Sequence, residues 1–318
     1  MISKSMPIKR IYARLVLSRR AGVSSEVELA AMRRAIAISA QGLGTTSPNP
    51  PVGCVILDKA GVIVGEGYHR RKGEAHAEVN ALKAAGVRAL GGTAVVTLEP
   101  CNHYGRTPPC RQALLDAGVS RVVVALLDPT SRGEGGVAAL RAAGVSVDVG
   151  VGECEALVVL GQWRRSLEGG PQVTWLYALS GEGGPIVPPP GSDAGRDATA
   201  FLRVADLVVD EHLSMVEGQP GGHDWTLSEQ TAPEDADPAA FLARIAEIGA
   251  RTVTVVGGSR FAVDLSRAGL LARSVSYLPC TNPSDTPHWA PGSSWSSSGH
   301  HIVDVLALPG WVRVTTEV

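Results

Sequence analysis

The first half of the chain alternates between strand-like and helix-like segments. Residues 26–41 carry apolar residues at helical spacing, and they precede Gly42, which tolerates the left-handed conformation after a helix. PVGCVILD and VIVGEGYH flank a KAG turn and predict a β-hairpin. The strand-like GTAVVTLEP, RVVVALLDP and VSVDVGV then alternate with the helix-like AHAEVNALKAAG, CRQALLDAG and GGVAALRAAG. This alternation is typical of an α/β domain whose helices cover the sheet.

The second half has a different pattern. A predicted helix, ECEALVVLGQWRRSLEG, leads to a break at GGP, residues 169–171. Beyond it, SGEGGPIVPPPGSDAG and APGSSWSSSGHH predict loops, RVADLVVDE and ARTVTVVGG predict strands, and PAAFLARIAEIG predicts a helix. We therefore expect a basic extension at residues 1–25, a first α/β domain at 26–170 and a smaller, looser α/β domain at 171–318.

Composition excludes several function classes. The 318 residues have a formal net charge of −2 and only 4% aromatic side chains, which argues against a nucleic-acid partner. Five cysteines are too few for a disulfide framework and favour a reducing compartment, with the cytoplasm as the default location. No apolar run is long enough to predict a membrane-spanning helix.

The first 25 residues are basic and contain no acidic side chain. A secretory signal would need a longer apolar core than IYARLVL, which Arg14 interrupts. An organellar transit peptide has such a composition, but we favour a disordered basic arm or an extension from an upstream start codon.

Four residues of the first domain suggest a catalytic zinc site. His76, Cys101 and Cys110 are predicted to lie where strands meet helices, so their side chains can converge at one edge of the sheet. A catalytic zinc takes three such ligands and leaves a fourth position to water. Glu78, two residues after His76, is placed to act as a base rather than as a ligand. This is the H-x-E…P-C arrangement of zinc deaminases, in which the metal activates water and the glutamate moves its proton.

The spacing of the cysteines narrows the substrate. Nucleoside and tRNA deaminases commonly use Pro-Cys-x-x-Cys, whereas here the eight residues NHYGRTPP separate Cys101 from Cys110. We expect this insertion to loop out beside the metal. Its His103 and Arg106 are donors suited to an anionic or polyhydroxyl substrate, although a solvated loop is the simpler interpretation.

Three motifs carry a resemblance to a known family. SPNPPVGCVI, GEGYHRRKGEAHAE and TLEPCNHYGRTPPC resemble the deaminase domain of the bifunctional riboflavin-biosynthesis deaminase/reductase, over about residues 28–170. The resemblance implies a cytidine-deaminase-like three-layer domain that binds zinc through His76, Cys101 and Cys110 and shuttles protons through Glu78. It also implies a small phosphorylated aminopyrimidine as substrate, 2,5-diamino-6-ribosylamino-4(3H)-pyrimidinone 5′-phosphate.

The same resemblance implies four substrate contacts. Asn49 would contact the pyrimidine, and His69, His103 and Arg106 would face the ribose phosphate. Taken without the resemblance, Asn49 is a turn residue before a proline. Likewise, His69 is then a surface histidine at the end of a strand.

The second half departs from the family. It resembles a degenerate dihydrofolate-reductase-like domain, which in the family uses NADPH. DEHLSMVEGQPGG replaces the nucleotide loop, and Val256 stands where the family has an acidic residue. Gly257 and Gly258 remain, and their amides could approach a phosphate, although such a pair is more often a turn. We therefore expect an inactive reductase, or another role such as formation of a homodimer, and NADPH binding only if the domain is active.

The predicted function is thus zinc-dependent deamination, in riboflavin synthesis or in a secondary-metabolite branch from it. Three alternatives stay open: a fully bifunctional deaminase/reductase, a deaminase of another aminopyrimidine or nucleoside, and a zinc-stabilised scaffold protein. The long loop between the cysteines and the lack of a basic surface argue against a tRNA deaminase. Glu78 argues against a scaffold, because a structural zinc site needs no carboxylate beside an open metal position.

Overall fold

The computed structural model describes residues 24–103, 108–131, 134–219, 237–280 and 301–317. The chain divides into two compact units. The first comprises residues up to Ser39, Val52–Tyr68 and Ala75–Leu157, and the second comprises Ala40–Pro51, His69–Glu74 and Val158–Val318. The boundary expected at residues 170 and 171 stays a prediction, and the basic extension at 1–25 lies almost wholly outside the described residues.

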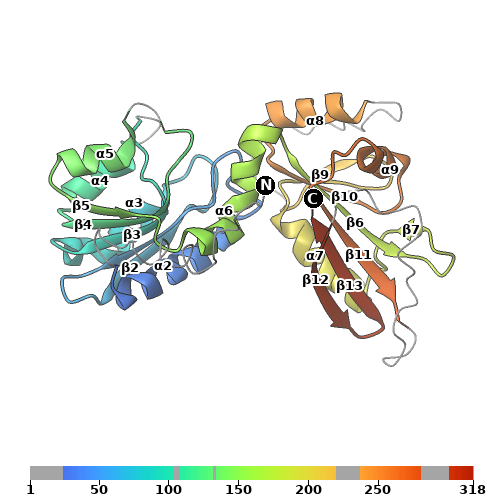
Figure 1. The fold of residues 1–318 in the computed structure, drawn as a ribbon, viewed down its shortest axis with the longest axis horizontal. Helices are drawn as coiled ribbons and strands as arrows, with labels where there is room; N and C mark the ends of the chain where they lie inside the picture. The colour runs from blue at the N-terminus through green and yellow to red at the C-terminus, as the bar shows by residue number, and fades with distance from the viewer. Residues whose placement is uncertain (1–23, 104–107, 132–133, 220–236, 281–300, 318) are drawn as a thin grey trace, which may run out of the picture. The chain divides into compact units, whose positions relative to one another are not determined.

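The first unit is built on a five-stranded sheet in the order β2-β1-β3-β4-β5 (Figure 1). β1 pairs antiparallel with β2 and β3, whereas β3, β4 and β5 run parallel. The strands span Gly53–Leu57 (β1), Ile63–Tyr68 (β2), Thr93–Leu98 (β3), Arg121–Leu126 (β4) and Ser146–Val149 (β5). The predicted hairpin and the three strands that follow it are therefore confirmed.

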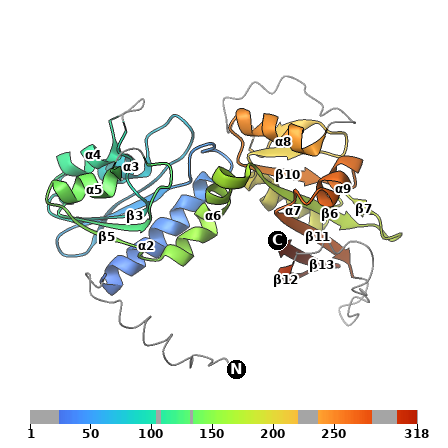
Figure 2. The ribbon, with the colours of Figure 1, turned by 45° about the horizontal axis from the view of Figure 1, so that its top comes forward.

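Helices cover both faces of this sheet (Figure 2). On one face lie α3 (Ala77–Ala85), α4 (Cys110–Asp116) and α5 (Gly135–Ala142), whose buried side chains share a core with alternate residues of the strands. On the other face lies α2 (Glu26–Ser39), which is followed by the short helix η1 (Ala40–Gly42). The helix η2 (Gly86–Ala89) follows α3 directly. The long helix α6 (Glu153–Gly169) begins in this unit and ends in the second.

The second unit has a larger mixed sheet in the order β12-β13-β11-β6-β10-β8-β9, with β7 paired to β6. The strands are β6 (Gln172–Leu179), β7 (Pro185–Ile186), β8 (Leu207–Val209), β9 (Met215–Glu217), β10 (Thr252–Val256), β11 (Arg273–Pro279), β12 (His301–Leu308) and β13 (Trp311–Glu317). One hydrophobic core joins the sheet to α8 (Pro238–Glu247) and α9 (Arg260–Arg267). A second core joins it to α7 (Asp193–Val204).

One prediction in the second half was wrong, because SGEGGPIVPPPGSDAG, predicted as a loop, contains β7 and the start of α7. The strand predicted for RVADLVVDE is confirmed as β8, although its first two residues belong to the end of α7. The Ser192 hydroxyl accepts a hydrogen bond from Gly195 N and starts the helix despite the prolines that precede it. The predicted loop APGSSWSSSGHH lies outside the described residues, except that its last residue, His301, begins β12.

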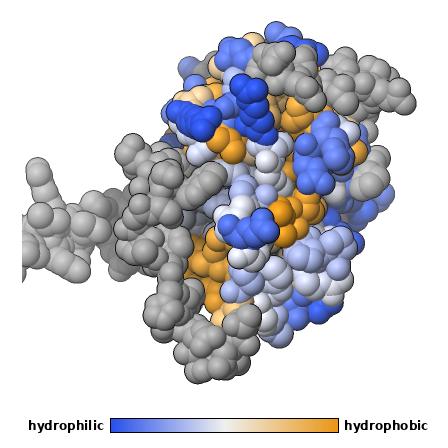
Figure 3. Space-filling model, turned by 90° about the vertical axis from the view of Figure 1, so that its right-hand side faces the viewer, coloured by the Kyte–Doolittle hydropathy of each residue, from blue (hydrophilic) through white to orange (hydrophobic). Residues whose placement is uncertain are grey.

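The surface of the second unit is mixed in hydropathy on the face that Figure 3 shows, where small hydrophobic areas alternate with hydrophilic ones. β12 exposes four large apolar side chains: Ile302, Val303, Val305 and Leu306. A homodimer stays a prediction. Within the part of the chain that the structure describes, no helix has the length and hydropathy needed to cross a membrane.

Candidate metal centre

Three side chains of the first unit converge on one point. The Nδ1 atom of His76 lies 3.2 Å from Cys110 Sγ and 3.7 Å from Cys101 Sγ. The ligand atoms of all three residues lie within 4.8 Å of one another. His76 directly precedes α3, Cys101 lies just beyond β3, and Cys110 is the first residue of α4. All three residues therefore lie between a strand and a helix or at the start of a helix, as predicted from the sequence.

This donor set fits a zinc ion. Zinc binds thiolate sulfur at about 2.3 Å and imidazole nitrogen at about 2.0–2.1 Å in a tetrahedron, which separates the ligand atoms by about 3.6–3.8 Å. The measured separations of 3.2 and 3.7 Å from Nδ1 to the two sulfurs need only a small adjustment to reach those values. Three ligands of these types also leave a fourth position, which is typical of catalytic rather than structural zinc.

Close backbone packing places the start of α3. A Cβ atom added at Gly67 of β2 would lie 2.4 Å from Ala81 N and 2.6 Å from Ala77 O. Only glycine permits α3 to lie so near the strand. The Asn80 amide also donates hydrogen bonds to Tyr68 O at 2.9 Å and Ala75 O at 3.2 Å, tying the helix to both ends of the preceding loop. These contacts fix the turn that carries His76.

Glu78 lies in the first turn of α3 and is only 3% exposed. Burial raises the pKa of its carboxyl, although the nearby His76 imidazole acts in the opposite direction. Its carboxyl group also interacts with the Cys110 side chain. A carboxyl that is buried, held beside the metal ligands and shifted towards neutrality is suited to accept and return a proton.

The two cysteines differ electrostatically. A hydrogen bond from the Cys110 side chain lowers the pKa of Cys101 to about 4, and the Cys110 backbone N–H, 3.2 Å from Cys101 Sγ, acts in the same direction. A hydrogen bond with the Cys101 sulfur, together with burial, raises the pKa of Cys110. A hydrogen bond with Cys101 also raises the pKa of His76. Among the protein groups alone, Cys101 is thus the preferred thiolate, and a cation in this position would favour ionisation of both thiols.

The predicted substrate contacts fall in several places. Asn49 Nδ2 lies 3.3 Å from His69 Nε2, and both residues belong to the second unit. His69 is 2% exposed, so the alternative of a surface histidine is wrong. His103 is exposed, and Arg106 lies outside the described residues.

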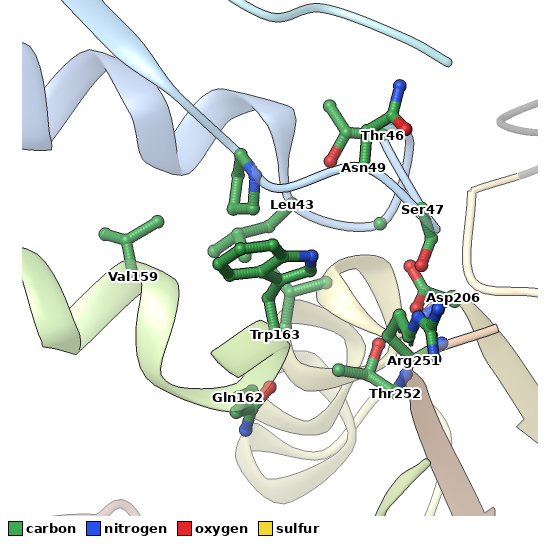
Figure 4. A pocket seen from close by; sticks show the side chains of 13 residues that line it. Leu43, Thr46, Ser47, Asn49, Val159, Gln162, Trp163, Asp206, Arg251 and Thr252 are labelled. Carbon is green, nitrogen blue, oxygen red and sulfur yellow. Dashed lines mark hydrogen bonds between the residues drawn. The ribbon is translucent and has the colours of Figure 1, made fainter. Parts of the chain in front are cut away.

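Asn49 also contributes to a small cavity within the second unit (Figure 4). Its volume is about 30 Å³, which suits a single water molecule. Trp163, Asp206 and Arg251 line it, and the Asn49 amide points away from the Trp163 ring. This cavity is too small for a nucleotide-sized substrate.

The glycine pair of the second unit is a tight turn after β10. Gly257 donates a backbone hydrogen bond to Leu176 O at 2.9 Å and accepts one from the Trp175 indole at 2.8 Å. A Cβ atom at Gly258 would lie 2.1 Å from Pro185 O, and one at Gly257 would lie 3.5 Å from a carboxylate oxygen of Glu211. Both backbone groups of Gly257 are thus engaged by residues of β6, and the Glu211 carboxylate lies close to the turn.

Sequence reasoning missed Glu99 and Asn80. Glu99 directly precedes the Pro-Cys pair and lies at the end of an apolar strand, where a buried carboxylate calls for a partner. Its burial of all but 7% and its three hydrogen-bond donors emerge only from the fold. Asn80 lies one helical turn after His76, and this spacing alone is weak evidence for a role at the site.

Comparison with known proteins supports this description. The zinc-binding region of cytidine and deoxycytidylate deaminases matches residues 25–126, which include His76, Glu78, Cys101 and Cys110. The chain is 53% identical over 121 residues to the diaminohydroxyphosphoribosylamino-pyrimidine deaminase of Buchnera aphidicola subsp. Schizaphis graminum, a match covering 38% of this chain and 82% of that protein. It is 56% identical over 126 residues to the riboflavin biosynthesis protein RibD of Escherichia coli, covering 39% of this chain and 34% of that protein. The matched segment thus spans about a third of the E. coli relative.

Solved structures extend the likeness to both units. RibD of Acinetobacter baumannii is 26% identical, with a TM-score of 0.74 over 92% of this chain and 99% of that one. A deaminase/reductase of Thermotoga maritima, 22% identical, has the same fold with a TM-score of 0.71 over 92% of this chain and 98% of that one. The predicted fold class, a cytidine-deaminase-like domain followed by a reductase-like one, is therefore confirmed.

Proposed function

Because this chain belongs to the diaminohydroxyphosphoribosylaminopyrimidine deaminase family of riboflavin biosynthesis, we propose that it deaminates the substrate that gives the family its name. The reaction converts 2,5-diamino-6-ribosylamino-4(3H)-pyrimidinone 5′-phosphate and water into 5-amino-6-(5-phosphoribosylamino)uracil and ammonia. The observation that carries the proposal is the convergence of His76, Cys101 and Cys110 beside the buried Glu78.

His76, Cys101 and Cys110 would hold the zinc ion. A zinc ion held there supplies the Lewis acidity that makes water a nucleophile at neutral pH. The bond from Cys110 N to Cys101 Sγ orients one sulfur, and the packing of α3 against β2 orients the imidazole. The protein's part is to fix these three donors before substrate arrives.

Glu78 would carry the proton. Its carboxylate accepts a proton from the attacking water, while a C–O bond forms at the ring carbon that bears the amine. The carboxyl then donates this proton to the ring nitrogen. Glu78 then accepts the second proton of that water from the new C–OH group and donates it to the amine, so that the carbonyl forms, the C–N bond breaks and ammonia leaves. The raised pKa of Glu78 brings its two protonation states closer in energy, which both transfers require.

Four further residues would contact the substrate. Asn49 would contact the pyrimidine, and His69 would orient Asn49 through their 3.3 Å contact as well as face the ribose phosphate. His103 and Arg106 would also face the phosphate. If these assignments fail, the same metal centre would serve another aminopyrimidine or a nucleoside.

We propose no reductase step for the second unit. A dinucleotide pyrophosphate needs free backbone amides and positive potential at a glycine turn. Here Gly257 N is bonded to Leu176 O, and Glu211 brings a negative charge to the same turn. These residues do not fit NADPH. A deaminase without its own reductase suits either riboflavin synthesis, with the reduction supplied elsewhere, or a secondary-metabolite branch.

One incubation tests the proposal. Protein, zinc, the diaminopyrimidine ribosyl phosphate and NADPH are combined, and the products are identified by mass spectrometry. We expect ammonia and a product with a closed ribose ring. Opening of the ribose by reduction would contradict the assignment of the second unit, and an untouched substrate with zinc bound would contradict the proposed substrate.

The matched control is Glu78→Gln, which keeps the shape of the side chain. We expect it to retain zinc and fold while turnover falls about 10²–10⁴-fold, the usual contribution of a general acid–base group. Unchanged turnover would contradict the proton-shuttle role, and loss of zinc would make Glu78 a structural residue.

A further inference from the structure

A second buried carboxylate lies next to the metal centre. Glu99 follows β3 directly and precedes Cys101 by two residues. Its side chain is 7% exposed. One oxygen, Oε1, accepts a hydrogen bond from Val137 N at 2.9 Å, and the other, Oε2, accepts from Asp128 N and the Ser131 hydroxyl, each at 3.2 Å. Both oxygens therefore bind segments that follow β4.

Glu99 serves as the cap of a helix to which it does not belong. α5 has no side-chain cap of its own, because the side chain of its N-cap residue, Glu134, makes no such bond. Val137 is the third residue of α5, so its N–H is one of the donors that a helix leaves unpaired at its start. A negative charge at this end is also favoured by the helix dipole.

Two glycines allow this close approach. Gly135 has a φ of +77°, and a Cβ atom there would lie 2.4 Å from Glu99 Oε1. A Cβ atom at Gly136 would lie 1.8 Å from Pro100 O. Another residue at Gly136 would require the backbone to move, and one at Gly135 would displace the Glu99 carboxylate and strain the positive φ. The start of α5 is thus pressed against the two residues that precede Cys101.

On its other side, the segment Glu99–Cys101 is held by the start of α4. Cys101 Sγ accepts a hydrogen bond from Cys110 N at 3.2 Å, and Cys101 O accepts one from Arg111 N at 3.4 Å. The backbone at Cys101 therefore lies between two helix starts, one of which is connected to it through Glu99.

We propose that Glu99 is a positioning residue for the metal centre: by binding Asp128, Ser131 and Val137, it fixes where Cys101 presents its sulfur to His76 and Cys110. It does not touch the reacting atoms, because its oxygens are occupied by three donors. Partners that orient a metal ligand typically change metal affinity or activity 10–100-fold when they are lost. The kinetic consequence rests on the proposed deaminase function, whereas the consequence for zinc affinity does not.

Glu99→Gln is the informative substitution. An amide offers one acceptor oxygen where the carboxylate offers two, so its NH₂ group must face either Val137 N–H or Asp128 N–H, and neither can accept a hydrogen bond. Ser131→Ala is the milder variant, since it removes one donor and leaves the carboxylate and both backbone bonds in place. It keeps the inference testable if Glu99→Gln does not fold.

The control is Glu28→Gln. Glu28 is 8% exposed and belongs to the same unit, but it pairs with Arg121, the first residue of β4, whereas Glu99 follows the end of the parallel strand β3. It is therefore a buried, hydrogen-bonded carboxylate at the opposite edge of the sheet. Both Gln variants should lower the thermal midpoint, but only Glu99→Gln should affect the metal.

The experiment measures zinc affinity by competition with a chromophoric chelator, the absorption spectrum of the cobalt-substituted protein, and kcat and KM. We expect Glu99→Gln to weaken zinc binding 10–100-fold, to shift the cobalt thiolate bands and to lower kcat more than KM changes. Ser131→Ala should act in the same direction by a smaller factor. If Glu99→Gln has the same zinc affinity and cobalt spectrum as Glu28→Gln, Glu99 is only structural and the inference is overturned. If Glu99→Gln does not fold, the same comparison is made with Ser131→Ala, and the same result overturns the inference. Zinc and cobalt effects without any turnover in the wild-type chain would instead contradict the proposed substrate and leave the positioning role supported.

Discussion

Substituting Gly67 by alanine should displace the start of α3 and thereby disturb the metal centre, although Gly67 itself lies on β2. A Cβ atom at Gly67 would lie 2.4 Å from Ala81 N and 2.6 Å from Ala77 O. Ala77 is the residue between His76 and Glu78. Because both obstructing atoms are backbone, no side-chain rotation relieves the overlap. The start of α3 must therefore move away from β2.

The size of the effect follows from the overlap. Ordinary contact begins at 3.4 Å, so α3 must move by about 1 Å. Overpacking of this kind destabilises a protein by about 1–3 kcal/mol. A displacement of about 1 Å at a catalytic group lowers the rate by about 10²-fold. We therefore expect Gly67→Ala to stay folded at 25 °C, with a lower thermal midpoint and kcat/KM reduced about 10²-fold.

Gly65→Ala is the matched control. A Cβ atom at Gly65 would lie 2.3 Å from Ala81 O and 2.7 Å from Ala85 N, an equal overlap on the same helix but nearer its far end. Its loss of stability should equal that of Gly67→Ala, while its loss of kcat/KM should be several-fold smaller. Thermal unfolding, zinc content and steady-state kinetics are measured on both variants. Equal activity losses, or a fully active Gly67→Ala, would refute the claim that this packing sets the position of His76 and Glu78.

Two further predictions concern metal and pH. Removing zinc with a chelator should abolish turnover and lower the thermal midpoint, because a ligand present at 1,000 times its dissociation constant stabilises the folded state by about 4 kcal/mol; a midpoint unaffected by zinc would contradict the proposed metal centre. Burial opposes ionisation of Glu28, but hydrogen bonds from Arg121 and Ser25 outweigh it and lower its pKa. A lowered folded-state pKa gives stability that is present above the unfolded pKa of about 4.3 and is lost as the pH falls through the folded pKa. The difference in urea midpoint between wild type and Glu28→Gln should therefore be largest near neutral pH and shrink towards about pH 3.5, and a difference independent of pH would contradict this assignment.

The positions of His76, Cys101 and Cys110 could be predicted from sequence because each residue lies at an element boundary that local rules identify. A strand that ends in Pro-Cys and a helix that begins with Cys110 specify positions at one sheet edge before the sheet order is known. The burial of Glu78 was not predicted and emerges only from the fold, in which the first turn of α3 packs against β2. What local rules cannot supply is the 3.2 Å approach of His76 to Cys110 across 34 positions.

The second unit resisted prediction for a physical reason. α7 begins right after a Pro-rich stretch and contains Gly195, so its propensity argues against a helix, yet Ala194 and Ala198 bury one face in the core. Its helical form is decided by tertiary packing and by the Ser192 cap. For His69, local sequence offered only a surface position at the end of a strand, whereas the fold buries it and brings it within 3.3 Å of Asn49, twenty positions away.

The long insertion between the cysteines is compatible with a compact metal site because hydrogen bonds join the residues at its two ends. Eight residues separate Cys101 from Cys110, yet Cys110 N donates to Cys101 Sγ at 3.2 Å and Arg111 N donates to Cys101 O at 3.4 Å. The Arg111 side chain also bonds to Asn102, the first residue of the insertion. The two sulfurs are thus fixed by the start of α4, whatever residues the insertion contains. The positions of the two cysteines are therefore set by contacts at the ends of the insertion, so its length does not prevent Cys101 and Cys110 from converging with His76.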